Sequence, residues 1–401
     1  METTGRLVTL VVVTPDGEVA GQLPRLAVDT PWWQDGAAVV VAARAAFGVD
    51  LTILRVLSAD RSRPPGGAVT YLAEAPGAPE DLPLERSLVH LAEHPLRMSW
   101  ARASGPAGDV AWAIEELTVR GLLPAGSPEQ VRTWNLSSLW RIPVEGQTAW
   151  LKVVPPFFGH EGAVIEALGG GPVPVLIAHA GPRMLMHEIP GEDLYGAPLD
   201  RLLEMIPLLT TIQSAWSGRE PELLALGLPD WRAEPLSRGI GSTVDRTAAE
   251  LDSGDRSTLA GFVSTLPARF AAIAACGLPD TLVHGDFHPG NVRGDRDSMT
   301  LLDWGDCGLG HPLLDQPAFI GRSPEAPVAA ISQRWEELWK DLVPGCDPAR
   351  ASALIAPVAA ARQAVIYRRF LDQIEPSEHP YHRDDPREWL QRTAAFVRAE
   401  G

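Results

Sequence analysis

The sequence predicts an α+β protein in which a β-rich segment leads into a mainly helical one, with a small α/β segment ahead of both. Three observations indicate this architecture. Short apolar runs of strand length alternate with turn signals up to about residue 191, and helix-length apolar patterns dominate after it. A strand-rich island at residues 281–306 then interrupts these helices. This order of elements predicts two structurally different lobes.

The chain is expected to divide into four parts. These are a small α/β domain at residues 1–92, a linker with a helix at 93–130, a β-rich lobe at 131–191 and a helical lobe at 192–401. In the first part we expect strands at 7–13, 51–57 and 68–73 and a helix at 39–47. In the second, residues 95–108 are rich in Gly, Pro, Ser and Ala, and residues 109–120 predict a helix.

The β-rich lobe is expected to contain five strands around one helix. The predicted strands are 131–134, 139–144, 148–153, 173–178 and 183–189, and the helix is 159–168. In the last part the predicted helices are 199–216, 242–251, 258–276, 331–342, 349–374 and 389–398.

Charge and composition exclude several classes of partner. The 401 residues carry 51 acidic and 34 basic side chains, a formal net charge of −17. Nucleic-acid binding needs clustered Lys and Arg, so neither nucleic acid nor an anionic membrane surface is expected as a partner. No run approaches the roughly 20 apolar residues that span a bilayer. Three separated cysteines form no C-x-x-C pair, which fits a reducing compartment, so we expect a cytoplasmic protein.

The island carries a set of hard-oxygen side chains at suggestive spacing. Asp286 is followed five residues later by Asn291 and twelve residues after that by Asp303. Pro289-Gly290 predicts a tight turn between the first two, and residues 299–302 predict a return strand that delivers Asp303 to the same place. Carboxylate and amide oxygens suit Mg²⁺, which also keeps phosphate and water ligands. Asp286 is then available to orient a hydroxyl group and accept its proton.

These residues resemble the aminoglycoside phosphotransferase and choline kinase superfamily, whose fold is that of protein kinases. The catalytic-loop pattern H-G-D-x-x-x-x-N stands at His284–Asn291, and the metal motif stands as Leu302-Asp303-Trp304. Gly310–Asp315 matches the G-x-P-x-x-D element that follows them. The resemblance covers residues 130–401 and implies a protein-kinase-like two-lobed fold with MgATP or MgGTP between the lobes.

The resemblance also implies roles for residues outside the island. Asp286 becomes the catalytic base, and Asn291 and Asp303 become the Mg²⁺ ligands. Lys152, one of only two lysines in the chain, stands on the third strand of the β-rich lobe, where the family holds the α- and β-phosphates. Its carboxylate partner on the next helix is expected to be Glu161, which we prefer to Glu166.

Two further parts of the nucleotide site follow from the resemblance. The adenine-facing hinge is expected around Met186 and Glu188. The loop between the first two strands contains Ser137 and Ser138 but no glycine, whereas protein kinases use a glycine-rich loop there to bring backbone N–H groups onto the phosphates. We assign the phosphate-cradling role to these two serines.

Several residues have a second interpretation. His284 and His288 flank Asp286 and could be read as metal ligands, but a histidine in this loop more often braces the turn. Asp306 is read as a solvated or turn-capping residue rather than a further metal ligand. Asp315 is read as a helix cap rather than a substrate contact.

The N-terminal domain faintly resembles the Nudix hydrolases, whose box needs glutamates to bind Mg²⁺. Aligning Gly48-Val49 with the end of that box places Trp33, Ala42, Ala45 and Ala46 at the glutamate positions. None is acidic, so hydrolysis is not expected there. A degenerate Nudix-like domain retained for packing or for a homodimer contact is the alternative that we favour.

The function expected from the sequence is that of a small-molecule kinase. It transfers the γ-phosphate of ATP or GTP to a hydroxyl of an aminoglycoside, an amino sugar, a nucleoside antibiotic or a similar natural product, and a cationic acceptor and a role in antibiotic resistance are both open. The alternative is a nucleotide-binding pseudokinase that acts as a sensor or scaffold. The intact Asp286, Asn291, Asp303 and Lys152 count against it, because a pseudokinase usually loses at least one of these residues.

Overall fold

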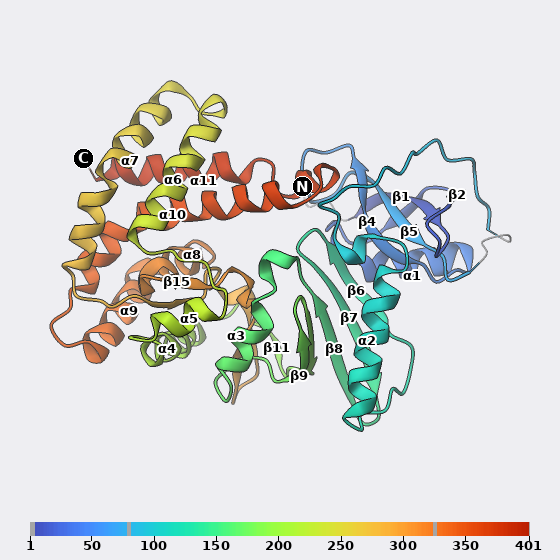
Figure 1. The fold of residues 1–401 in the computed structure, drawn as a ribbon, viewed down its shortest axis with the longest axis horizontal. Helices are drawn as coiled ribbons and strands as arrows, with labels where there is room; N and C mark the ends of the chain where they lie inside the picture. Colours follow the sequence, from blue (N-terminus) through green and yellow to red (C-terminus); the bar gives the residue numbers. More distant parts are fainter. Residues whose placement is uncertain (1–4, 78–81, 324–326, 401) are drawn as a thin grey trace. The chain divides into compact units, whose positions relative to one another are not determined.

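The computed structural model describes residues 5–77, 82–323 and 327–400, and the chain forms two compact units (Figure 1). The first unit combines residues 1–162 and 176–188 with the later segment 370–383, and the second contains the rest. The strands and helices of the first unit are β1 (Arg6–Val13), β2 (Val19–Gln22), β3 (Leu26–Val28), α1 (Gly36–Phe47), β4 (Thr52–Ala59), β5 (Ala68–Glu74), α2 (Gly105–Val119), β6 (Glu129–Trp134), β7 (Ser137–Val144), β8 (Gln147–Val153), the start of α3 (Glu161–Ala167), β9 (Leu176–Ala180) and β10 (Arg183–His187).

The N-terminal residues form a mixed sheet with the strand order β2-β1-β5-β4, and β3 also pairs with β1. β1 is apolar along most of its length and is buried in the centre of this sheet, where it runs parallel to β5. Helix α1 packs Val39 and Ala43 against the sheet and ends at Gly48, whose φ of +69° suits a residue without a Cβ atom. Trp33, which aligns with a glutamate position of the Nudix box, is 1% exposed in the same core. The Nudix likeness stays a prediction.

A second sheet of the first unit has the order β6-β7-β8-β10-β9. Residues of β7 alternate between partly exposed and buried, and the buried ones include Trp140, Ile142 and Val144. This period of two is that of a strand with one face in a core. Helix α2 covers that face with Ala113 and Leu117, and Figure 1 shows it lying along β7 and β8.

One side chain joins the two sheets of the first unit, because it forms the two backbone hydrogen bonds that a neighbouring strand would form. The Gln130 amide on β6 accepts a hydrogen bond from the Ile53 N–H and donates one to the Ile53 carbonyl on β4, both at 2.8 Å. Gln130 is 7% exposed, so this pair of bonds is shielded from water. A buried amide that pairs with both backbone groups of one residue links the two sheets at a fixed position.

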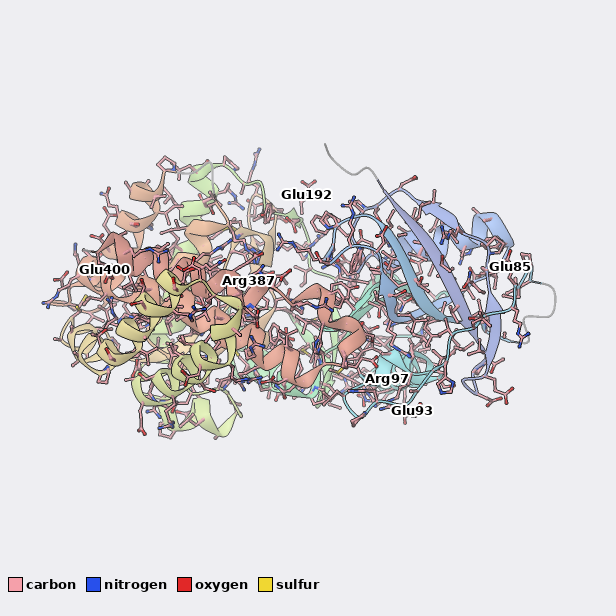
Figure 2. All side chains as sticks on the ribbon, turned by 90° about the horizontal axis from the view of Figure 1, so that it is seen from above. Glu85, Glu93, Arg97, Glu192, Arg387 and Glu400 are labelled. Atoms are coloured by element: carbon pink, nitrogen blue, oxygen red, sulfur yellow. The ribbon has the colours of Figure 1, made fainter. Side chains whose placement is uncertain are left out.

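The segment 370–383 follows the longest helix of the chain and packs into the core of the first unit. Tyr381 makes edge-to-face contacts with Trp33 and Trp134, each at 5.7 Å between ring centroids. Glu375 pairs with Arg97 and Arg55 at 3.1 Å in both cases. Figure 2 shows Arg97 beside Glu93, with which it forms a further ion pair at 3.6 Å.

The second unit is mainly helical and holds small sheets. Its elements are β11 (Glu192–Asp193), α4 (Leu199–Ala215), α5 (Glu220–Ala225), α6 (Ala233–Thr247), α7 (Ser253–Ala274), β12 (Thr281–Val283), β13 (Val292–Gly294), β14 (Met299–Leu301), β15 (Gly308–Gly310), α8 (Gln316–Gly321), α9 (Val328–Leu342), most of α10 (Pro348–Gln373) and α11 (Asp385–Ala399). The strands form β11-β13-β14 and β12-β15; β12, β13 and β14 lie in the island expected at 281–306, whereas β11 and β15 lie outside it. None of the helices described here combines the length and the hydropathy needed to cross a membrane.

The expected elements are largely present, but the short elements β2, β3, α5, α8, β11 and β15 were not expected, and two helices begin earlier than predicted. Helix α6 begins at Ala233, although 242 was expected, and α7 begins at Ser253, although 258 was expected. The Asp252 carboxylate caps α7 by accepting the Asp255 N–H at 2.7 Å. The first turn of α7 is polar, so its apolar periodicity begins only after it, whereas the unpredicted start of α6 already contains the buried residues Leu236 and Ile240.

Candidate active site

Lys152 and Glu161 meet in the first unit. Lys152 lies on β8 and Glu161 begins α3, and the Lys152 Nζ is 2.7 Å from the Glu161 Oε1. The two side chains are 15% and 2% exposed. A buried carboxylate at this distance holds the ammonium group in one position, with the lysine still partly accessible. This pair is the one that the resemblance predicts.

The expected hinge residues Met186 and Glu188 lie on β10 and just after it, in the same sheet. Met186 lies on β10 opposite Trp150 and is 8% exposed. The Glu188 N–H donates to the Thr148 carbonyl at 3.2 Å, and its carboxylate accepts the Trp150 indole N–H at 2.7 Å. The amide N–H of Glu188 therefore already has a partner, and the role of both residues toward adenine stays a prediction.

Ser137 and Ser138, which we expected in the first loop, are the first two residues of β7, and both have indole partners. The Ser137 hydroxyl accepts the Trp134 Nε1–H at 2.9 Å, and the Ser138 hydroxyl accepts the Trp140 Nε1–H at 3.0 Å. Ser138 is fully buried, whereas Ser137 is partly exposed. Of the two, Ser137 is the better placed for a phosphate contact, which remains a prediction.

In the second unit, a sharp turn presents the Asp286 side chain. Gly285 has a φ of +93°, and a Cβ atom there would lie 2.0 Å from the Asp306 carbonyl oxygen, so only glycine fits. The His284 imidazole is completely buried and lies 2.9 Å from the Leu302 carbonyl through Nε2. Burial lowers the pKa of His284 to about 4, so it is neutral and braces the loop rather than carrying charge.

The Asp286 carboxylate is held as an anion by its neighbours. Burial raises its pKa, but the hydrogen bond from His288 and the positive charge of Arg322 outweigh this effect and bring the pKa to about 2. The His288 Nε2 lies 3.4 Å from Asp286 Oδ2, while His288 Nδ1 accepts the Gly290 N–H at 3.0 Å. Since Nδ1 is an acceptor, the ring proton is on Nε2 and faces Asp286. His288 is thus a partner of the carboxylate rather than a metal ligand.

Asn291 and Asp303 are brought together by strand register. Val292 on β13 pairs with Leu301 on β14, and the Leu302 N–H donates to the Asn291 carbonyl at 2.8 Å. Asn291 and Asp303 therefore flank the same end of this hairpin. Asp303 has a φ of +59° and a ψ of 64°, a left-handed conformation that is uncommon for a residue with a Cβ atom. Such conformations are concentrated at functional sites.

The donor set of these residues fits Mg²⁺. The Asn291 Nδ2 donates to the Asp286 carbonyl at 2.9 Å and to its Oδ2 at 3.3 Å, which leaves the Asn291 Oδ1 as the outward-facing atom of the amide. The Asp303 side chain is exposed and adds carboxylate oxygens. Among the described residues, no group of three His, Cys, Asp or Glu side chains forms a metal site. Two protein ligands completed by phosphate and water are typical of magnesium at a nucleotide.

We expected Asp315 to cap a helix, but its carboxylate instead supports the loop that carries Asp286. It lies at the start of α8, but its carboxylate makes no cap bond there. Instead, it accepts the backbone N–H groups of His284 at 2.9 Å and Gly285 at 2.7 Å, and the Gln213 amide at 3.0 Å. Burial raises its pKa to about 6, against the lowering effect of the Arg362 charge. From the other side, Arg362 donates to the Gly285 and Asp306 carbonyls, both at 3.2 Å.

Replacing Asp315 by Ala is expected to lower the free energy of unfolding of the helical unit by about 3–5 kcal/mol. The change leaves Arg362 as a buried charge without its compensating carboxylate and leaves two loop N–H groups without an acceptor. Urea denaturation followed by far-ultraviolet circular dichroism measures the effect. Asp341→Ala, at an exposed position on α9, is the control and should change stability by less than about 0.5 kcal/mol. Equal effects of the two substitutions would contradict the supporting role of Asp315.

An ionised carboxylate on a braced turn, two further oxygen-bearing side chains beside it and a strand lysine paired with a helix glutamate are the features expected of a phosphotransferase of the kinase type. The chain matches the model of the phosphotransferase enzyme family over residues 141–342 and belongs to that family. It is a small-molecule phosphotransferase whose acceptor is a hydroxyl group.

Solved structures show the same fold at low sequence identity. A putative aminoglycoside phosphotransferase from Ralstonia eutropha is 16% identical, with a TM-score of 0.50, over 72% of this chain and 98% of that one. An ethanolamine kinase from Plasmodium vivax is 9% identical, with a TM-score of 0.53, over 73% of this chain and 89% of that one. A macrolide 2′-phosphotransferase from Brachybacterium faecium is 16% identical, with a TM-score of 0.50, over 69% and 97%. A search of curated protein sequences gave no match. The predicted α+β, kinase-like fold is confirmed.

Sequence reasoning missed the residues that surround Asp286. Arg362, Gln213 and Arg322 all act on the catalytic loop, yet each lies more than 30 positions from Asp286 in the sequence. No local pattern marks them. The one available signal was Asp315, which belongs to the G-x-P-x-x-D element but was assigned a different role.

Proposed function

We propose that this protein transfers the γ-phosphate of ATP or GTP to a hydroxyl group of a small natural product, with aminoglycosides, amino sugars and nucleoside antibiotics as the first classes to test. The observation that supports this most directly is the position of Asp286 at a cavity of about 350 Å³ in the helical unit. A cavity of this size suits a small molecule, and Asp286 contributes a permanently ionised carboxylate to its wall.

Each residue has a defined task in this proposal. Asp286 accepts a hydrogen bond from the acceptor hydroxyl, which orients the oxygen for in-line attack, and takes the proton late in the transfer. Lys152, held by Glu161, binds the α- and β-phosphates. Asn291 and Asp303 would hold Mg²⁺, which when bound neutralises phosphate charge. The protein thus positions the reactants and compensates charge, as expected for phosphoryl transfer.

The proposal is tested by phosphoryl transfer from MgATP and MgGTP to a panel of aminoglycosides, amino sugars and nucleoside antibiotics, with Asp286→Ala measured beside the wild type. Transfer to one acceptor that is lost in the variant supports the proposal. Nucleotide binding without transfer to any acceptor would instead favour the sensor or scaffold.

Replacing Lys152 by Ala is expected to lower kcat/KM for the nucleotide by at least about 10²-fold, because two charge-assisted phosphate contacts are lost. Steady-state kinetics at saturating acceptor measure this. The matched control is Lys340→Ala, the only other lysine of the chain, which is half exposed on α9 and pairs with Glu336. If the Lys152 variant keeps the wild-type kcat and the wild-type KM for the nucleotide, another residue holds the phosphates.

A further inference from the structure

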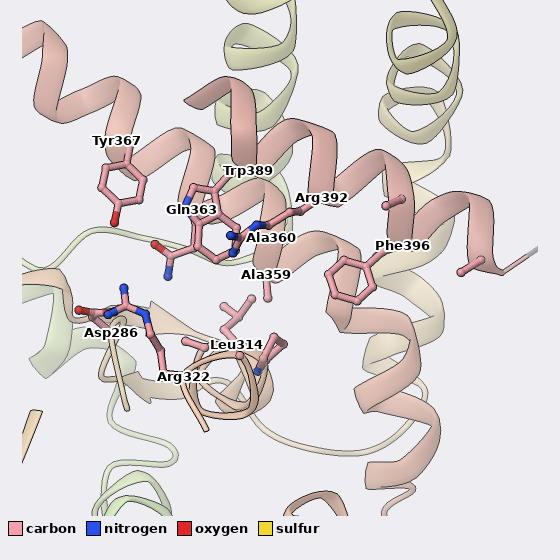
Figure 3. A pocket seen from close by; sticks show the side chains of 15 residues that line it. Asp286, Leu314, Arg322, Ala359, Ala360, Gln363, Tyr367, Trp389, Arg392 and Phe396 are labelled. Carbon is pink, nitrogen blue, oxygen red and sulfur yellow. The ribbon is translucent and has the colours of Figure 1, made fainter. Parts of the chain in front are cut away.

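The acceptor cavity is walled by three helices of the second unit. Residues at three- and four-residue spacing line it on each helix, including Gln363 and Tyr367 on α10 and Trp389, Arg392 and Phe396 on α11. Figure 3 shows these side chains converging on the space that Asp286 and Arg322 border on the opposite side. This regular spacing on α10 and α11 means that the packing of the helices itself forms the cavity.

Most of this wall is apolar. Leu314, five alanines, Trp389 and Phe396 line it, and Phe396 is 42% exposed although its side chain is large and apolar. Because alanine side chains are small, they leave space in the cavity. A ligand in that space would pack against the aromatic side chains of the opposite wall. Such a wall favours an acceptor with an apolar ring or chain, because its burial removes apolar surface from water.

The charges in the cavity are mainly positive. Arg322 and Arg392 line it, while Asp286 is the only carboxylate on the wall among the described residues. The Arg322 Nη1 lies 3.4 Å from the His288 Nε2, and the Arg392 guanidinium lies over the Trp389 ring at 4.6 Å from its centroid. Within the part of the chain that the structure describes, neither arginine forms a salt bridge with a carboxylate. Both guanidinium groups therefore retain donors for an anion.

This arrangement opposes a polycationic acceptor. Each ammonium group would meet two like charges, and the single carboxylate is already committed to the hydroxyl and to His288. Like charges at close range discriminate strongly against a ligand, whereas a carboxylate or phosphate group can make paired hydrogen bonds to a guanidinium. The formal charge of −17 belongs to the whole chain and is not the charge of this cavity.

We propose that the acceptor is a hydroxylated acid: an apolar ring or chain packs between Trp389, Phe396 and Leu314, an anionic group pairs with Arg392, and the hydroxyl points to Asp286. This inference rests on the proposed function for the assignment of the cavity to the acceptor. It separates the protein from kinases of polyamine antibiotics, and it names Arg392 as the residue that determines the charge of the acceptor.

The test uses three probes that share the aryl group and the secondary hydroxyl and differ in the charge of the group beside it: phenyllactate, phenyllactamide and 1-amino-3-phenylpropan-2-ol, with the naphthyl counterpart of each. Binding to the full-length protein is measured by calorimetry without nucleotide, so the result does not depend on turnover. The carboxylate probe should bind about 5- to 10-fold more tightly than the amide, since Arg392 is exposed and an exposed ion pair contributes only about 1 kcal/mol. The ammonium probe should bind more weakly than the amide.

Arg392→Gln should reduce the preference for carboxylate over amide to within about threefold and leave amide binding unchanged. Arg334→Gln is the control, since this arginine lies on α9 and does not line the cavity, and it should keep the wild-type preference. Both variants are checked for an unchanged circular dichroism spectrum.

Three results would overturn the inference. They are equal or tighter binding of the ammonium probe, no binding of the carboxylate probe, and an Arg392→Gln variant that keeps the wild-type preference. Transfer of phosphate to amino alcohols alone would overturn it while supporting the proposed function. Conversely, carboxylate-selective binding with no transfer from either nucleotide to a wide range of hydroxy acids would support the inference about the cavity and contradict the proposed function.

Discussion

Replacing Asp286 by Asn is expected to lower kcat by about 10²-fold, at the lower end of the range for loss of a general base. The lower end follows from the pKa of about 2, which makes the carboxylate a weak base. A base of this strength cannot remove the hydroxyl proton early. Its main contribution is orientation of the nucleophile, and the proton follows when the oxygen has already become acidic by bonding to phosphorus.

Steady-state kinetics with a saturating acceptor and varied nucleotide check this prediction, and the nucleotide KM should change by less than about threefold because Asp286 makes no part of the phosphate contacts. The control is Asp297→Asn, an exposed position in the turn between β13 and β14. If Asp286→Asn keeps more than about one tenth of the wild-type kcat, the hydroxyl is oriented by another residue.

The parts of the site that sequence analysis identified are those with local patterns. His284, Asp286 and Asn291 lie within eight residues, and the hairpin that brings Asp303 to them is short, so spacing alone indicates that they meet. Lys152 stood out because the chain has only two lysines. Its pairing with Glu161 over nine positions is the geometry of a strand followed by a helix.

The contacts that sequence analysis missed are long-range. Arg362 lies 77 residues from Gly285, and Gln130 lies 77 residues from Ile53, so no window of sequence contains both partners. The strands β3, β11 and β15 have two or three residues each, which is too short for periodicity to show. These strands form because tertiary packing holds a partner strand next to them. This pairing outweighs the intrinsic conformational propensity of their residues.

The segment 370–383 is another element that the sequence did not reveal, because it was assigned to the helical lobe. Its helical pattern continues α10 up to Gln373, and nothing in the pattern indicates that the next residues enter the core of the first unit. What brings them there is a buried cluster of charges. Arg55 and Arg97 are 4% and 8% exposed, and the Glu375 carboxylate that neutralises them is 5% exposed.

Replacing Glu375 by Ala is therefore expected to destabilise the first unit by about 3–5 kcal/mol, because two guanidinium groups stay buried without their carboxylate. Backbone carbonyls compensate only part of this cost: Arg55 donates to Ala101 at 2.9 Å and Arg97 donates to Ala92 at 2.7 Å. Hydrogen exchange measures the opening free energy locally, in the amides of β4 and of residues 374–383. Exchange in α7, which lies in the second unit, should be unchanged and serves as an internal reference.

Glu378→Gln is the matched control for this prediction. Burial and the neighbouring Glu375 charge raise the pKa of Glu378 to about 8, so at pH 7 this side chain is mostly protonated and the glutamine is a near-isosteric neutral replacement. Its opening free energy at pH 7 should therefore stay within about 1 kcal/mol of the wild type, the net value of one ordinary hydrogen bond. A similar loss in both variants would mean that packing, rather than the charge of Glu375, keeps the segment 370–383 in the first unit. A loss confined to Glu375→Ala would establish that one carboxylate holds this segment in place.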